Sequence, residues 1–574
     1  MRGLKEVPCP RYCGENVMHD VLLNPLADSS EKSRGAIYTR REVVETILDL
    51  IGYSPELPLW EKTVLEPCCG QGDFLIPIIG RLLASYRREH SSMFGAATAL
   101  KNAVCAVEIS TASHAMASAT VEDFLESEGV SSADAEALAA AWVIHADFLL
   151  ARLPKAFDFI VGNPPYLRQE RIPETLLAEY RRRYATLYDR ADIYVPFIER
   201  SLNLLRTDGR LGFICSDRWM KNRYGGPLRR MVSNGFHLKY VLSVNEVPAF
   251  TAEVIAYPAI FVVENTMANL PTRVAASPKT LDELDAAARQ MAGVVAPKDS
   301  VFREMSDVVI GDAPWLTDES EHIALIRRME RDFPTLEEAG CRVGIGVATG
   351  ADRIFIAPFD KLDVEDERKL PLIGTRDIAS GRVAWRGQGI VNPFEPDGTI
   401  AALDRYPRFA KFIRQNEEAL RKRHVAQRSG AAWYRTIDRI TTDLVAKPKL
   451  LIPDIKGAAN VVYEEGRYYP HHNLYFVLSE TWDLWALQAV LRSRLSQLFI
   501  TSYSLQMQGG YFRFQAQYLR RLRVPKWETV RPALRKRLAE AARSGDAEAC
   551  DYASAELFGL DDAELALLES ISKQ

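Results

Sequence analysis

The chain has 574 residues, of which 47% are hydrophobic and 26% are charged. This usage is that of globular proteins and excludes a disordered or collagen-like chain, and the length predicts two to four domains. The net charge of −4 excludes a chain that is basic throughout, but not a locally basic surface that binds nucleic acid.

The N-terminal residues, MRGLKEVPCPRYCGE, lack the apolar core of a signal peptide, and no run of about 18 apolar residues predicts a membrane span. We therefore expect a cytoplasmic protein with no membrane partner. Cys9 and Cys13 form a C-x3-C pair, but the nearest further candidate ligand, His19, does not complete a known zinc pattern. Reduced thiols are the expected state of this segment.

The first regular element is a predicted helix with apolar residues at helical spacing. These residues are Val43, Val44, Ile47, Leu48 and Ile51. Thr39 stands at the N-cap position and Glu42 follows three residues later, which is a capping-box arrangement. We expect this helix to begin at a Thr39 cap.

Short apolar strands alternate with helical segments over the next two hundred residues. The segments are TVLEPCCGQGDFLIPIIGRLLASYRRE, NAVCAVEIS, AEALAAAWVIHADFLL, FDFIVGNPPY, GRLGFICSDRW and KYVLSVNEV. Such alternation predicts an α/β fold with a doubly wound, mostly parallel sheet.

Changes in composition divide the chain into five predicted parts. From about residue 341, short strand-like runs with Gly or Pro punctuation replace the α/β alternation. The predicted parts are an N-terminal extension (1–34), the α/β domain (35–265), a linker with connecting helices (266–340), a mixed α+β domain (341–526) and a helical tail (527–574).

The tetrapeptide Asn163-Pro164-Pro165-Tyr166 follows the predicted strand FDFIV directly. Open α/β sheets bind ligands beyond the carboxyl ends of their strands, so this position favours a functional loop over a rigid turn with an exposed Tyr. The residue types suit methylation of an exocyclic amine, whose nitrogen is a poor nucleophile. The side-chain oxygen of Asn163 and the backbone carbonyl of Pro164 can accept its two hydrogens. Pro165 helps to stiffen the loop, Tyr166 offers a face for base stacking, and the chemistry requires no metal ion.

Asn-Pro-Pro-Tyr after such a strand resembles the catalytic motif of amino-methyltransferases that use S-adenosylmethionine (SAM). The order of the other segments resembles the gamma class (TaqI type) of DNA adenine-N6 methyltransferases from type II restriction–modification systems, over about residues 35–525. The resemblance implies a Rossmann-like SAM-dependent methyltransferase sheet in residues 35–265 and a target-recognition domain in residues 341–526. It also implies a prokaryotic, nucleoid-associated protein that protects host DNA from a separately encoded restriction endonuclease.

The resemblance assigns SAM-binding roles to four segments. The loop after the first strand would hold the methionine part, and the segment around Tyr38 would cover it. Glu108 would accept the ribose hydroxyls, and Asp147 would accept the adenine amine with Phe148 beside the ring. The candidate cofactor-binding residues are Tyr38, Thr39, Glu66, Pro67, Cys68, Gly70, Gly72, Phe74, Glu108, Ile109, Asp147 and Phe148. The family commonly has a small residue where this chain has Cys68. Read alone, the Gly-x-Gly of this loop, Glu108 and Asp147 are also typical of turns and strand ends.

The implied partner is double-stranded DNA, because an adenine inside a duplex must be flipped out to reach such a pocket. Phe250 resembles an aromatic residue that packs on the target base opposite Tyr166, although a core Phe is an alternative. Residues 401–450 hold twelve Lys and Arg against five Asp and Glu, which suits phosphate contact or a solvated helix face. The candidate DNA-binding residues are Arg421, Lys422, Arg423, Arg435, His471, His472 and Arg513.

Three alternatives remain at this point. Protein-glutamine and some RNA methyltransferases share Asn-Pro-Pro-Tyr, but they lack a large second domain like the one expected after residue 340. A bifunctional restriction–methylation enzyme needs a nuclease, for which the roughly 34 residues before the cofactor region are too few. The D-x-K of Asp454 and Lys456 has no evident paired acid. A DNA-binding module with an inactive fold is disfavoured by the intact tetrapeptide.

Overall fold

The computed structural model of the chain divides into two compact units, Met1–Thr317 and Asp318–Gln574, which we describe separately. The structure describes residues 26–27, 29–30, 34–93, 95–154, 156–252, 257–268, 270–275, 278–293, 301–317, 320–427, 429–454, 460–504 and 516–571. Cys9, Cys13, His19, Lys456 and Arg513 lie outside these ranges. Within them, no helix has both the length and the apolar composition needed to pass through a bilayer.

The first unit is built on a nine-stranded sheet with the order β3-β2-β1-β4-β5-β7-β6-β8-β9. The strands are β1 (Val64–Glu66), β2 (Val104–Glu108), β3 (Val143–His145), β4 (Phe157–Gly162), β5 (Leu205–Ser216), β6 (His237–Ser243), β7 (Pro258–Glu264), β8 (Thr272–Ala275) and β9 (Phe302–Met305). Strands β3, β2, β1, β4 and β5 pair in parallel. Strand β7, which the sequence analysis did not predict, runs antiparallel between β5 and β6. The predicted mostly parallel α/β fold is confirmed.

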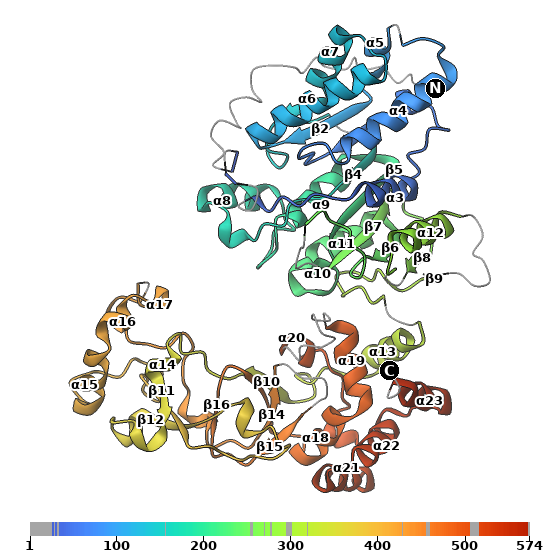
Figure 1. The fold of residues 1–574 in the computed structure, drawn as a ribbon. Helices are drawn as coiled ribbons and strands as arrows, with labels where there is room; N and C mark the ends of the chain where they lie inside the picture. The colour runs from blue at the N-terminus through green and yellow to red at the C-terminus, as the bar shows by residue number, and fades with distance from the viewer. Residues whose placement is uncertain are drawn as a thin grey trace, which may run out of the picture. The chain divides into compact units, whose positions relative to one another are not determined.

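Helices lie on both faces of this sheet (Figure 1). They are α3 (Arg41–Ile51), α4 (Leu75–Glu89), α5 (Ala96–Leu100), α6 (Thr111–Ser127), α7 (Ser132–Trp142), α8 (Glu174–Arg183), α9 (Tyr194–Leu204), α10 (Arg218–Lys221), α11 (Gly226–Gly235) and α12 (Leu281–Ala292). Helices α3, α4, α6, α7 and α12 share one buried hydrophobic cluster with the strands, whereas α9 contacts β5 and α11 contacts β6. Because both faces are covered, β2 and β4 are buried along their whole length, as their continuous apolar runs predict.

The predicted Thr39 cap of α3 is wrong. The N-cap residue is Arg40, and no side chain caps the helix. Thr39 instead forms an isolated antiparallel bridge with Phe250. The local capping pattern lost to a tertiary contact, because the extended backbone before α3 pairs with a loop more than two hundred residues later.

Two short strands lie in the segment 266–340, for which the sequence predicted a linker and connecting helices. Strand β8 pairs in parallel with β6, and β9 pairs antiparallel with β8, so both extend the sheet. Helix α12 lies between them in the chain. The domain boundaries given above stay predictions, with this addition to the content of the segment.

The second unit contains two four-stranded sheets, ordered β10-β17-β14-β15 and β11-β13-β12-β16. Its strands are β10 (Cys341–Ile345), β11 (Ile356–Pro358), β12 (Lys369–Ile373), β13 (Gln388–Val391), β14 (Lys449–Pro453), β15 (Val462–Glu464), β16 (Tyr469–Pro470) and β17 (Leu474–Ser479). Its helices are α13 (Ser320–Asp332), α14 (Asp352–Phe355), α15 (Pro407–Gln415), α16 (Glu417–Arg421), α17 (His424–Gln427), α18 (Leu484–Arg492), α19 (Arg494–Tyr503), α20 (Ala516–Leu519), α21 (Pro532–Ser544), α22 (Ala547–Phe558) and α23 (Asp562–Ile571). Within the unit, α18 to α23 gather at one end and α15 to α17 at the other (Figure 1). The predicted mixed α+β character of the second half is confirmed.

Candidate active site

A cavity lies where strands β1 to β4 end, and its empty space, together with the open solvent at its mouth, is about 860 Å³. Parallel strands present their carboxyl ends at one edge of a sheet, so the loops after these four strands meet there. The predicted residues that line the cavity are Tyr38, Thr39, Glu66, Pro67, Cys68, Gly70, Phe74, Glu108, Ile109, Asp147, Phe148, Asn163 and Pro165. Four predicted residues are not among the lining residues, namely Gly72, Pro164, Tyr166 and Phe250.

The loop after β1 turns sharply before α4 begins. Gly70 has φ +55° and Gly72 has φ +108°, a backbone conformation that favours glycine. The Gly70 backbone N–H donates to Oε2 of Glu108 at 2.9 Å, and the Gly72 N–H donates to the Cys69 carbonyl at 2.8 Å. The Cys68 thiol donates to the Asn163 carbonyl at 3.2 Å. The loop therefore binds to the ends of two neighbouring strands.

Four carboxylates line the cavity, and that of Glu66 interacts electrostatically with two of the others, Asp73 and Glu108. Glu66 is only 2% exposed, and its Oε2 has no hydrogen-bond partner among the described residues. Burial, together with the charges of Asp73 and Glu108, raises the pKa of Glu66 well above its ordinary value. Burial also raises the pKa of Asp73 and of Glu108, against opposing backbone hydrogen bonds. A cationic ligand would relieve this accumulation of negative charge.

The carboxylate of Asp147 has a fixed orientation at the cavity wall. It is 3% exposed, and its Oδ1 accepts the Leu149 backbone N–H at 2.8 Å. Its Oδ2 accepts the Tyr180 hydroxyl at 2.6 Å. Next to it, the Phe148 ring lies 5.0 Å from the ring of Phe197, centroid to centroid. This corner thus combines a directed acceptor with aromatic surfaces, which suits a purine ring.

The segment before α3 covers the cavity. The Tyr38 hydroxyl accepts the Gln71 side-chain amide at 3.0 Å, and the Thr39 backbone N–H donates to Oδ2 of Asp73 at 3.1 Å. Gly35 accepts the Tyr166 backbone N–H at 2.9 Å. Gly35 has φ +72°, and a Cβ there would lie 2.4 Å from the Tyr166 carbonyl oxygen, so the close approach requires glycine.

The Asn163 side chain is held by its amide nitrogen. Nδ2 donates to the Ile37 carbonyl at 2.9 Å and to the Thr39 hydroxyl oxygen at 3.1 Å. Because a carbonyl oxygen only accepts, the Ile37 contact identifies the amide atom that faces it as nitrogen. Oδ1 is buried and has no hydrogen-bond partner within the described ranges. An acceptor in this state is prepared to receive an N–H from a substrate.

The Tyr166 ring belongs to an aromatic group beside the loop after β4. Its centroid lies 6.4 Å from that of Phe250 at an interplanar angle of 80°, and 6.0 Å from that of Tyr194. Phe250 is 8% exposed and belongs to the hydrophobic core. The two rings meet edge to face, so they do not form a parallel sandwich in this structure. The stacking role of Tyr166 and Phe250 stays a prediction.

The sequence analysis missed several residues that line the cavity. Asp73 lies in the predicted loop and could have been found as a further acid just before a helix. Tyr180 and Phe197 come from α8 and α9, and no motif marks them. Arg34 also lines the cavity, and its charge favours the ionised form of Glu108.

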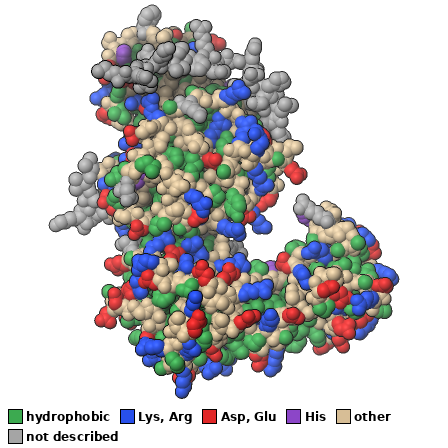
Figure 2. All heavy atoms as spheres, turned by 180° about the vertical axis from the view of Figure 1, so that it is seen from behind, with side chains coloured by type: hydrophobic (Ala, Val, Ile, Leu, Met, Phe, Trp, Pro, Cys, Tyr) green, Lys and Arg blue, Asp and Glu red, His purple; other side chains and the backbone are tan. Residues whose placement is uncertain are grey.

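Arg421 and Lys422 lie on the exposed surface of the second unit. Arg421 Nε contacts Glu417 Oε1 at 2.7 Å and its guanidinium lies 4.1 Å from the Trp433 ring centroid, while Lys422 Nζ contacts Glu418 at 2.6 Å. On the face drawn in Figure 2, Lys and Arg are interspersed with Asp and Glu. Phosphates would have to displace Glu417 and Glu418, so DNA contact by this pair stays a prediction.

Arg423 and Arg435 hold the backbone of the second unit together. Arg423 donates to the carbonyls of Thr349, Trp433 and Arg435 at 2.9–3.2 Å. Burial lowers the pKa of Arg423 below its ordinary value. Arg435 donates to the Thr436 carbonyl at 3.2 Å. Both side chains have a structural role. These hydrogen bonds do not test the predicted contact with DNA.

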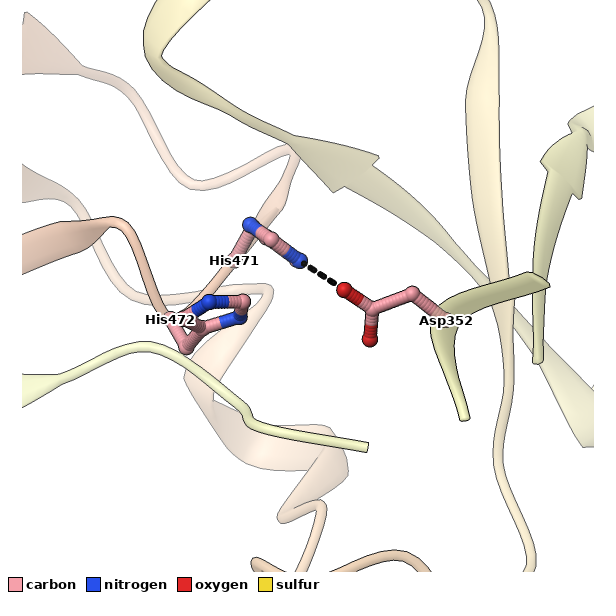
Figure 3. A group of neighbouring side chains, drawn as sticks. All are labelled: Asp352, His471 and His472. Carbon is pink, nitrogen blue, oxygen red and sulfur yellow. Dashed lines mark hydrogen bonds and ion pairs between the residues drawn. The ribbon is translucent and has the colours of Figure 1, made fainter. Parts of the chain in front are cut away.

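His471 and His472 lie beside Asp352 in the second unit (Figure 3). His471 Nε2 is 3.3 Å from Asp352 Oδ2. Burial and the neighbouring His471 lower the pKa of His472, although nearby carboxylates oppose the shift. Burial would raise the pKa of Asp352, but the Thr349 hydroxyl and His471 hold it below its ordinary value. The predicted contact of the two histidines with DNA stays a prediction.

Comparison with known proteins places this geometry in a family. Residues 88–250 match the Eco57I restriction-modification methylase, and residues 371–524 match the TaqI-like C-terminal specificity domain. The Type II methyltransferase M.PaeR7I of Pseudomonas aeruginosa is 52% identical over 94% of this chain and 94% of its own length. The Type II methyltransferase M.XhoI of Xanthomonas vasicola is 50% identical over 94% of this chain and 99% of its own length.

The solved structure of the Type IIL restriction-modification enzyme MmeI in complex with DNA shares the fold of the chain. Its TM-score is 0.58 at 10% sequence identity, and the match covers 92% of this chain and 76% of that one. Eleven of the 24 residues that line the cavity fall within the methylase match, and strands β13 to β17 fall within the specificity match. The chain therefore belongs to the type II DNA methyltransferases of restriction–modification systems, with an Eco57I-type methylase domain followed by a TaqI-like specificity domain.

Proposed function

We propose that this methyltransferase transfers a methyl group from SAM to the N6 amine of an adenine that is flipped out of duplex DNA. The state of Asn163 carries the proposal. Its Nδ2 is occupied by Ile37 and Thr39, while its buried Oδ1 has no partner in the described part of the chain. Oδ1 can accept one hydrogen of the adenine amine and the backbone carbonyl of Pro164 the other, which stabilises the positive charge that develops on nitrogen.

The cavity fits SAM in charge. The carboxylates of Glu66, Asp73 and Glu108 suit a ligand with an ammonium and a sulfonium group. Bound SAM supplies an electrophilic methyl group on a positive sulfur. Glu108 would bind the ribose hydroxyls and Asp147 the adenine amine of the cofactor, with Phe148 against its ring. The buried, unpartnered Oε2 of Glu66 supports a cationic occupant.

The proposed substrate implies a macromolecular partner, a biological role and a cellular location. Double-stranded DNA is the proposed partner, with Tyr166 and Phe250 against the extruded base and the second unit on the duplex. The biological role is protection of host DNA from a separately encoded restriction endonuclease, as the family implies. The proposed substrate places the activity in the cytoplasm of a prokaryotic cell, at the nucleoid.

The test is methyl transfer from labelled SAM by the purified full chain to duplex DNA, to RNA and to protein, followed by nucleoside analysis. We expect label in DNA alone, as N6-methyladenine. Label in cytosine would overturn the adenine assignment, and label in RNA or in protein glutamine alone would overturn the DNA assignment. Modification-sensitive sequencing of a host that expresses the protein then gives the sequence context.

The variant that tests the site is Asn163→Ala. Removal of a transition-state acceptor lowers kcat by about 10²- to 10³-fold, while SAM and duplex binding change little. Asn222→Ala is the matched control, because Asn222 lies outside the cavity lining, at the end of α10. An Asn163→Ala variant with the wild-type kcat would show that another group activates the amine.

A further inference from the structure

We propose that Asp352, His471 and His472 in the second unit form a binding site for a divalent transition-metal ion. The donor set of two imidazoles and one carboxylate favours Zn²⁺. Each side chain offers one ligand atom, and these atoms all lie within 4.8 Å of one another. Asp352 begins α14, and the two histidines occupy the turn between β16 and β17. The proposed methyl transfer uses none of the three, so this site is independent of the active site.

The spacing of the ligand atoms suits tetrahedral coordination. His471 Nε2 lies 3.3 Å from Asp352 Oδ2. Two ligands bound at about 2.0–2.1 Å in a tetrahedron lie about 3.3–3.4 Å apart, so this pair already spans one edge. The imidazole rings of His471 and His472 lie side by side, with centroids 4.1 Å apart and an interplanar angle of 53° (Figure 3). A ligand atom of His472 lies within 4.8 Å of the other two, so the ring must approach them to occupy the third corner.

The donor set selects the class of ion. Two imidazoles and one carboxylate suit zinc and its neighbours in the first transition series, whereas Mg²⁺ and Ca²⁺ prefer oxygen ligands alone. Three protein ligands leave one position for water. Asp352 is 47% exposed, so an ion can enter from solvent.

The ligands are held in place by other parts of the unit. Asp352 Oδ1 accepts the Thr349 hydroxyl at 2.5 Å, which leaves Oδ2 directed at His471. The backbone N–H of His471 donates to Ile373 at 2.9 Å, and that of His472 donates to Val347 at 3.0 Å. Such outer contacts orient the ligands of metal sites and raise their affinity.

A bound ion would connect the turn that carries His471 and His472 with the segment that follows β10. Asp352 follows the loop after β10, and the histidines lie in the turn after β16. A Cβ on Gly346 would lie 2.1 Å from the His471 carbonyl oxygen, so these two backbones already touch. The ion adds a side-chain link to this contact and fixes the position of both loops.

The test uses the full chain without a histidine tag, stripped by a chelator and then titrated with Zn²⁺ in competition with a chromophoric chelator. A Cys9→Ser/Cys13→Ser background removes the C-x3-C pair, which could bind Zn²⁺ in competition with the proposed site. We expect one equivalent of Zn²⁺ to bind in this background. His472→Ala and the isosteric Asp352→Asn weaken that binding at least tenfold, whereas His424→Gln, at an exposed histidine of the same unit, leaves it unchanged.

A Co²⁺ titration gives a second readout. We expect an intense visible absorption band that indicates four-coordinate cobalt and that is lost in His472→Ala. Unfolding temperatures measured in chelator should match those of the unchanged background, which shows that the variants fold. The proposal is wrong if the background protein binds no Zn²⁺, or if His472→Ala and Asp352→Asn bind it as tightly as the background. It is also wrong if His472→Ala weakens DNA binding in chelator while Zn²⁺ affinity is unchanged.

Discussion

The side-chain amide nitrogen of Asn163 lies 2.9 Å from the backbone carbonyl oxygen of Ile37, a residue 126 positions earlier in the chain. The contact joins the loop after β4 to the segment that covers the candidate active-site cavity. It also fixes the direction of the Asn163 amide, because the carbonyl accepts only from nitrogen. The geometry of the proposed acceptor therefore depends on residues outside the tetrapeptide.

Thr39→Val should lower kcat. The hydroxyl oxygen of Thr39 accepts from Asn163 Nδ2 at 3.1 Å, and its loss removes one of two contacts that hold the amide. We expect a decrease of about 5- to 20-fold, which corresponds to roughly 1–2 kcal/mol, and recovery in Thr39→Ser. Thr46→Val is the matched control, because Thr46 is also buried and its hydroxyl donates within α3, to the Glu42 carbonyl. Equal kcat values for Thr39→Val and wild type in single-turnover assays would contradict this role.

Tyr180→Phe should weaken SAM binding. The lost hydroxyl donates to Asp147 Oδ2 at 2.6 Å and orients the carboxylate at the cavity wall. We expect the Kd for SAM, measured by calorimetry, to rise about 5- to 20-fold, because hydrogen bonds to charged groups contribute about 1.5–3 kcal/mol and one backbone contact remains. Tyr184→Phe serves for comparison, since Tyr184 lies at the end of the same helix but donates to the Leu149 carbonyl. A larger effect of Tyr184→Phe than of Tyr180→Phe would argue against this account.

Gly35→Ala should reduce both stability and activity. Its Cβ would lie 2.4 Å from the Tyr166 carbonyl oxygen, at φ +72°. Gly95→Ala separates the two causes, because Gly95 has φ +79° but nothing within 4 Å of its Cβ. We expect Gly95→Ala to cost about 1–2 kcal/mol of unfolding free energy and to keep kcat. Gly35→Ala should cost more and lower kcat at least tenfold, as measured by denaturant unfolding and methylation assays. Identical effects of the two substitutions would exclude a steric role of Gly35.

Asp217→Asn should stabilise the protein at high pH only. Burial raises the pKa of Asp217 to about 6, although Lys221 and Arg218 oppose the shift, and Oδ1 has no partner among the residues described. A carboxyl with a raised folded-state pKa contributes its full stability below the unfolded value of about 4 and loses it as the pH rises through 6. We expect Asp217→Asn to gain about 2–3 kcal/mol at pH 8 and nothing at pH 4, as measured by urea unfolding.

Asp158→Asn gives the opposite sign. Burial alone would raise the pKa of Asp158, but the Thr63 backbone N–H and Arg206 hold it below its ordinary value. Such a group stabilises the fold above its unfolded pKa and loses that contribution as the pH falls through the folded value. Asp158→Asn should therefore destabilise at pH 7 and have little effect below about pH 3. Parallel pH profiles for the two variants would show that the assigned shifts are wrong.

The loops of the active site could be predicted because each follows a buried strand directly. Glu66 and Glu108 end β1 and β2, and Asp147 and Asn163 follow β3 and β4. Parallel strands bring such positions to one edge of the sheet, whatever the arrangement of the helices. The sequence predicted twelve cofactor-binding residues and Asn163, and twelve of these thirteen residues line the cavity. Gly72 is the exception, because it lies in the turn after β1, where its N–H donates to the Cys69 carbonyl.

Other contacts depend on tertiary packing and left no local signal. Tyr180 and Phe197 reach the cavity because α8 and α9 pack beside it, and their sequences are those of ordinary amphipathic helices. Thr39 matched a capping pattern, but its backbone pairs with Phe250 instead. In the second unit, the positive count around Arg423 suggested phosphate contact, yet the guanidinium binds backbone carbonyls. Charge alone does not distinguish an internal brace from a free cation.

The bridge between Thr39 and Phe250 has a consequence for motion. Thr39 pairs through its backbone with Phe250 and through its side chain with Asn163, and the Arg40 N–H and Thr251 N–H extend the same short ladder. Thr39 therefore links the Asn163 amide to the segment that carries the Phe250 ring. A displacement of either loop would therefore move the other, so under the proposed function the two loops would set the width of the opening for the base together.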